Sequence, residues 1–171
     1  MEKLTQQQIS SILELHDKWL NGIEGGTRAD FSHKDLSDTN LESANLKSAN
    51  LNNANLESAK DDFFARLSLA KTEALDLYDY LMKGKIDGSC YQGECACFCG
   101  TIAKVRGENF RILSNGLEPD PESPTERLFL SIKKGDIPQN NQISAIVANW
   151  MREFMDKEKI QYPKYEIIAI I

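Results

Sequence analysis

The hydrophobic positions along this chain are most regular over residues 29–58. Within this stretch a large apolar residue recurs at every fifth position. These positions are Phe31, Leu36, Leu41, Leu46, Leu51 and Leu56. An α-helix repeats every 3.6 residues and a β-strand every two, so neither element accounts for a period of five. A strict short repeat predicts a solenoid, in which each unit buries its apolar face against the neighbouring coils.

A second column of residues follows the same period. An asparagine stands directly before the central leucine at Asn40, Asn45, Asn50 and Asn55. Asparagine is a natural turn residue because its side chain can bond nearby backbone groups. We therefore interpret this column as structural. His33 falls at an outward position of the repeat and is expected to be solvated.

The order small residue, Asn or Asp, then Leu resembles the pattern A-(D/N)-L-x-x of the pentapeptide-repeat family. It is written most clearly in 44–46 and 49–51. The resemblance implies a right-handed quadrilateral β-helix with four pentapeptides per coil and the Leu, Phe and Ala side chains pointing inward. Six such units would make about one and a half coils. The repeat covers about a fifth of the chain, so it indicates an architecture rather than an activity.

Residues 5–21 have the spacing of an amphipathic helix. Thr5 and Gln8 form a capping-box pattern at its start. A solenoid end exposes apolar side chains and unpaired strand edges, so we expect this helix to cap the N-terminal end of the β-helix. His16 lies on the apolar stripe. A ligand or an acid/base group is one reading of it, but we interpret it as a partly buried helix histidine, because no partner for it is evident nearby in the sequence.

Helical spacing returns after the repeat. A helix is predicted over 62–83 with Asp61 or Asp62 as its N-cap, and the box Ser123-Pro-Thr-Glu126 opens another. The fold class is therefore α+β, with a capping helix at 1–28, the β-helix at 29–60 and a mainly helical domain at 61–171. The remaining predicted elements are a short helix over 94–105, a loop over 108–123, the capped helix continuing to about 134, a helix over 142–157 and an apolar strand over 165–171 that is buried or intermolecular.

Composition narrows the classes of function. The formal net charge is −6 and the pI is about 5.0, with no basic patch, so we expect no direct nucleic-acid binding. No stretch has the pattern of a signal peptide or a membrane span. We therefore expect a cytoplasmic protein that does not engage a membrane.

Four cysteines lie close together in the sequence. They are Cys90, Cys95, Cys97 and Cys99. Thiolate clusters bind zinc or iron–sulfur groups, but the usual spacing is C-x2-C in paired loops. On a helix Cys97 would point away from Cys95 and Cys99, whereas on a strand all three would share one side. We interpret them as buried packing residues, with a metal site and a redox or disulfide role as alternatives.

Catalytic patterns are not evident elsewhere. A nucleophilic cysteine needs a base and an electropositive setting, and Glu94, Ala96 and Phe98 supply neither. No phosphate-binding glycine loop or serine-centred elbow occurs. We therefore expect a protein that is not an enzyme and uses no cofactor.

A second resemblance covers more of the chain. Residues 86–107, 123–127 and 135–141 look like segments carried by small pentapeptide-repeat proteins of bacteriophages and prophages. This implies a non-enzymatic interaction module that binds or inhibits a host protein, such as a defence component. The terminal apolar run and the ends of a short solenoid also predict a homo-oligomer.

One alternative is an inhibitor of a topoisomerase or nuclease. Better-known members of the family inhibit a type II topoisomerase by imitating duplex DNA in length and charge. This chain departs from them, because its repeat is short and its outer face mixes both signs of charge. Acidic residues there are Asp30, Asp35, Asp38, Glu42 and Glu57, and basic residues are Lys34, Lys47 and Lys60. The other alternative is a metal or redox module built on the cysteines.

Overall fold

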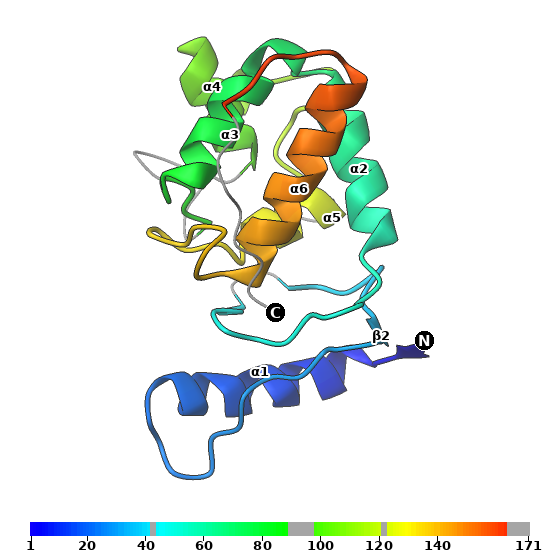
Figure 1. The fold of residues 1–171 in the computed structure, drawn as a ribbon, viewed down its shortest axis with the longest axis vertical. Coiled ribbons are helices and arrows are strands. Elements are labelled where there is room, and N and C mark those ends of the chain that lie inside the picture. Colours follow the sequence, from blue (N-terminus) through cyan, green and yellow to red (C-terminus); the bar gives the residue numbers. More distant parts are fainter. Residues whose placement is uncertain (42–43, 89–97, 121–122, 164–171) are drawn as a thin grey trace.

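The computed structural model describes residues 1–41, 44–88, 98–120 and 123–163. Figure 1 shows three layers: helix α1 (Gln6–Leu20) at one end, the repeat segment in the middle, and the remaining helices at the other end. The repeat segment is therefore enclosed between two helical parts of the chain.

Helix α1 begins where the sequence predicts. The Thr5 side chain accepts from the Gln8 amide, and the Gln8 side chain accepts from the Thr5 amide at 2.8 Å, so both halves of the capping box are present. The residues before α1 form a strand that the sequence did not indicate. This strand, β1 (Glu2–Lys3), pairs in parallel with β2 (Lys34–Asp35). Because Asp35 also pairs with Asn55, three backbone segments lie side by side on this side of the repeat.

Each of the first five units closes a tight turn, whereas the unit of Leu56 continues into helix α2. The amide three residues after a central apolar residue donates to the carbonyl of that residue at 3.0–3.2 Å, as in Ala49 to Leu46 and Ala54 to Leu51. The polar residue before the centre accepts from the amide two residues later. This Asx bond occurs at Asp30, Asp35, Asn45, Asn50 and Asn55. The structural interpretation of the asparagine column is confirmed at Asn45, Asn50 and Asn55.

Four units bring the backbone back alongside itself. Parallel bridges join Asp30 to Asn50 and Asp35 to Asn55. The Phe31 amide donates to the Asn50 carbonyl at 2.8 Å. The side chains stack as well, because Asn50 and Asn55 donate from Nδ2 to Asp30 and Asp35, each at 3.0 Å. A coil of twenty residues therefore stacks on the start of the next.

The described residues contain only the two short strands β1 and β2. The mixed class with helices and repeats agrees with the predicted α+β class, but no continuous β-helix sheet is visible. The reason is length: helix α2 (Glu57–Ser68) begins inside the last unit, so the second coil stops before it can pair with every side of the first. The six central residues are all buried, with exposed fractions between 0 and 7%.

The prediction of a single helix over 62–83 is wrong. Helix α2 starts at Glu57 behind Leu56, which forms no side-chain cap, and the backbone leaves the helical region at Ala70 (φ −130°). A 3-10 turn η1 (Lys71–Glu73) and helix α3 (Ala74–Met82) follow. Asp62 is not an N-cap, because its carboxylate accepts hydrogen bonds from Ser123 and Thr125.

The later helices are partly as expected. Helix α4 (Phe98–Arg106) is followed by Gly107 at φ +69°, a left-handed conformation that favours glycine. The 3-10 turn η2 (Phe110–Ile112) lies within the predicted loop. Ser123 caps α5 (Pro124–Phe129), which stops five residues short of the predicted end because Leu130 and Ser131 turn away. Helix α6 (Gln142–Lys157) is confirmed. Residues 94–97 and the terminal strand predicted at 165–171 lie outside the described residues.

The buried residues form one core across all three layers. It runs from Ile9 of α1 through the central residues of the repeat to Phe63 and Val147 in the helices. The rings of Phe98, Phe129 and Trp150 surround Phe63, with centroids 5.9–6.1 Å away. The repeat is therefore packed as part of a common core.

We predict that Leu46→Ala lowers the free energy of unfolding by about 2–5 kcal/mol, because Leu46 is fully buried and its truncation leaves a cavity in a coil that cannot collapse. Urea denaturation followed by circular dichroism measures the change. Lys47→Ala is the matched control, since its side chain is exposed in the same unit, and a change within about 0.5 kcal/mol is expected. Equal effects for the two variants would contradict the buried position.

Candidate functional site

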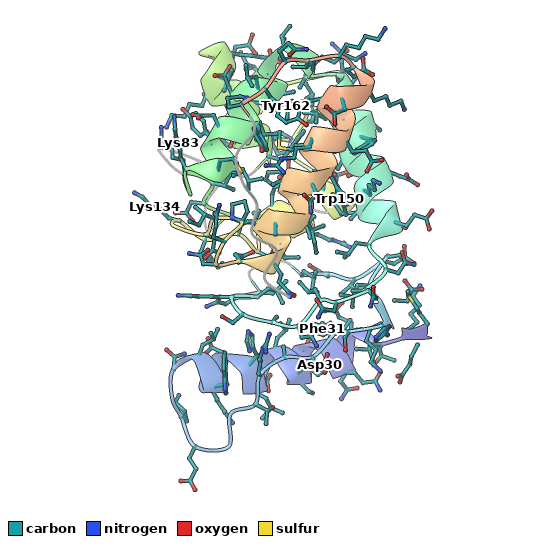
Figure 2. The ribbon with its side chains drawn as sticks, viewed as in Figure 1. Asp30, Phe31, Lys83, Lys134, Trp150 and Tyr162 are labelled. Carbon is teal, nitrogen blue, oxygen red and sulfur yellow. The ribbon has the colours of Figure 1, made fainter. Side chains whose placement is uncertain are left out.

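A groove opens where the repeat meets helices α2 and α6. We call it the junction groove. Its volume is about 460 Å³, and it is lined by Leu51, Asn53, Ala54, Leu56, Glu57, Lys60, Ile146 and Trp150. Two segments that are distant in the sequence, 51–60 and 146–150, therefore build one surface. Figure 2 shows Trp150 on α6, on the side of the molecule that carries α2.

The repeat and α6 are joined directly beside the groove. The Leu51 amide donates to the Gln142 side-chain oxygen at 2.6 Å, at the first turn of α6. The Asn141 side chain caps that helix by accepting from the Ser144 amide at 2.9 Å. These bonds set the position of α6 against the coil, so the groove is held on rigid elements.

The floor of the groove is apolar and carries one aromatic anchor. Trp150 is half-buried, and its ring lies 6.1 Å from that of Phe63 at an angle of 40°. Ile146 stands one turn earlier on the same helix face. Tryptophan is enriched among the residues that dominate binding energy at protein interfaces. The arrangement suits an apolar side chain from a partner.

The rim of the groove is polar. Lys60 forms an ion pair with Glu153 at 2.7 Å and lies 5.4 Å from the centre of the Phe64 ring. Glu57 and Asn53 are exposed beside it. An apolar centre with a polar, solvated rim is the usual anatomy of a protein–protein interface. None of the described lining residues is a histidine, cysteine or serine.

The cysteine cluster is only partly described. Cys90, Cys95 and Cys97 lie outside the described residues. Cys99 is buried on α4, where its amide donates to the Glu126 carboxylate at 3.2 Å and its sulfur lies 3.5 Å from the Arg66 guanidinium. Within the part of the chain that the structure describes, no three His, Cys, Asp or Glu side chains are grouped to hold a metal ion.

Arg66 is the centre of a buried polar cluster between α2 and α5. Its guanidinium nitrogens lie 3.7 Å from Asp62 and 3.8 Å from Glu126, which is fully buried. Burial raises the pKa of Asp62, but hydrogen bonds from Ser123 and Thr125 and the Arg66 charge outweigh it, so that pKa lies below its ordinary value. These groups all serve contacts between helices, and we assign the cluster to structure.

The interpretation of His16 is corrected. The side chain is completely buried and has two backbone partners: the Ala29 amide at 3.1 Å and the Lys47 carbonyl at 3.0 Å. They are 13 and 31 residues away in the sequence, so local patterns could not have identified them. His33, by contrast, is exposed at a turn with φ +58°.

No helix of the described residues combines the length and the hydropathy that crossing a membrane demands.

Residues 27–60 match the model of the family described as pentapeptide repeats, in eight copies. This segment, which is about a fifth of the chain, therefore carries pentapeptide repeats. No curated protein and no solved structure matches the chain. The family suggests a protein-interaction module, and the remaining residues have to be interpreted from their own geometry.

We predict that Arg66→Met lowers the free energy of unfolding by about 3–5 kcal/mol, because it removes the positive charge that compensates the buried Glu126 carboxylate. Chemical denaturation near neutral pH measures this. Lys71→Met is the matched control, since Lys71 pairs with Glu158 at the surface, and about 1 kcal/mol or less is expected. A loss at Arg66 no larger than that at Lys71 would refute the buried cluster.

Proposed function

We propose that this protein is a non-enzymatic interaction module that binds a partner protein through the junction groove. The observation that carries the proposal is the half-buried Trp150 in an apolar groove built jointly by the repeat, α2 and α6. The pentapeptide-repeat family supports the same class of function. In this proposal the repeat is a short right-handed quadrilateral β-helix that serves as a scaffold, which the pairing of residues twenty positions apart supports.

We further propose that the module is encoded by a phage or prophage and that its partner is a host protein, such as a defence component. The support is the resemblance of residues 86–107 to segments of small phage and prophage pentapeptide-repeat proteins. An apolar binding groove is the feature that such a module needs in order to occupy a site on a host protein.

The alternative of a DNA-mimic inhibitor receives less support from the surface charges. Asp38 pairs with Lys3 at 2.7 Å, and Glu2 pairs with Lys34. Asp30 and Asp35 accept hydrogen bonds from the neighbouring coil, which orients their carboxylates along the stack of coils. A DNA mimic needs unpaired acidic groups in a long row.

We predict that Ile146→Glu abolishes capture of a specific partner, because it places a charge in the apolar floor of the groove. The tagged full-length protein is incubated with lysate of its native host, and retained proteins are identified by mass spectrometry. Asn149→Glu is the matched control: it introduces the same residue at an exposed position of the same helix that does not line the groove.

The decisive result is the difference between the two variants. A protein retained by the wild type and by Asn149→Glu but lost with Ile146→Glu supports the groove as its binding site. Retention of the same proteins by all three forms would overturn the assignment. Circular dichroism of both variants checks that each remains folded.

We also predict a homodimer or a larger homo-oligomer. Large apolar side chains are exposed on and after α1 at Leu15, Trp19 and Ile23, with exposed fractions of 38, 40 and 54%. Such side chains close together are typical of association surfaces. Light scattering coupled to size-exclusion chromatography measures the mass, and a monomer of 19.3 kDa at micromolar concentration would contradict the prediction.

A further inference from the structure

The C-terminal half of α1 contacts the repeat through a histidine ring, and the segment after α1 adds a bond from Arg28 Nε to the Ser48 carbonyl at 2.5 Å. His16 bonds the backbone of the repeat on both sides of its imidazole, at Ala29 and at Lys47. The ring is 0% exposed and stacks on Trp19, with centroids 5.5 Å apart and planes 13° apart. The N-terminal half is attached independently, by the pairing of β1 with β2 and by Gln6.

The two bonds require one neutral form of the ring. The Ala29 amide is a donor, so Nδ1 must present its lone pair. The Lys47 carbonyl is an acceptor, so Nε2 must carry the hydrogen. Protonation would add a hydrogen to Nδ1 that faces the Ala29 N–H. The imidazolium would therefore lose the bond from the Ala29 amide, and two N–H donors, Nδ1–H and the Ala29 N–H, would face each other in a buried site.

The surroundings of the ring do not compensate a positive charge. Burial is the largest influence and lowers the pKa of His16; Arg28, on the segment after α1, lowers it further. The bond to the Lys47 carbonyl and the charge of Asp17, on α1 itself, act in the opposite direction but are outweighed. The Lys47 residue that contributes this carbonyl has an exposed side chain.

We propose that His16 is a proton-operated latch, whose protonation releases the C-terminal half of α1 from the repeat. Release frees the Ala29 amide and the Lys47 carbonyl at the end of the coil. A free backbone donor and a free backbone acceptor of this kind pair with the extended backbone of another chain. The module thus carries a second interaction surface that is covered at neutral pH.

The direction of the pH dependence follows from the bound protons. The folded-state pKa lies below the unfolded value of about 6.5, so the latched state binds fewer protons than the open one. The latch is fully closed above about pH 6.5. As the pH falls from there toward the folded pKa, the ratio of latched to open molecules decreases by up to about tenfold per pH unit.

Hydrogen exchange of the full-length protein between about pH 7.5 and 5 tests the latch, with rates corrected for the intrinsic pH dependence of exchange. We expect the protection of the second half of α1 and of the Ala29 amide to fall on acidification, while that of α6 changes little. The chain has two histidines, so His33→Gln is the matched control and should behave as the wild type. His16→Gln cannot titrate and should show no such pH dependence of α1.

A second measurement does not depend on any variant. Nitrogen-15 NMR of the wild-type His16 ring should show the Nε2–H tautomer at about pH 7.5 and a titration below the ordinary histidine value of about 6.5. Titration of His16 at or above that value would overturn the proposal. Unchanged protection of α1 at a pH where His16 is charged would overturn it as well.

Discussion

The structure depends on how a solenoid of fewer than two coils satisfies the hydrogen bonds of its backbone. In a long solenoid each coil pairs with one above and one below. Here the second coil ends at Glu57, so much of the first coil has no strand beside it. Buried peptide groups without partners are costly, and other parts of the chain must supply those bonds.

Side chains supply them at both ends of the repeat. Gln6 donates to the Asn40 carbonyl at 3.0 Å and accepts from its amide at 3.2 Å, so one side-chain amide replaces the peptide group of an absent strand. Gln142 accepts from the Leu51 amide at the opposite end, and His16 bonds two backbone groups at the α1 end. The helices therefore supply backbone bonds that neighbouring coils supply in a longer solenoid.

This constraint also explains where binding is expected. A helix that covers the end of a coil forms an interface with it, and the junction groove lies at the interface between the repeat and α6. At the interface between the repeat and α1, the His16 ring forms two backbone bonds, which together require its neutral form. The two contacts thus differ in character: one is an open apolar groove, and the other is closed by a buried histidine with two backbone bonds.

The sequence by itself determined the local features. The period of five identified the pentapeptide repeat, and the patterns at Thr5 and Ser123 placed two helix starts correctly, because a capping bond and a turn involve residues only a few positions apart. Tertiary structure decided where α2 begins, which strand β1 pairs with, and what surrounds His16 and Trp150. Those outcomes depend on partners tens of residues away, such as Phe63 beside Trp150, and no local pattern encodes contacts of that range.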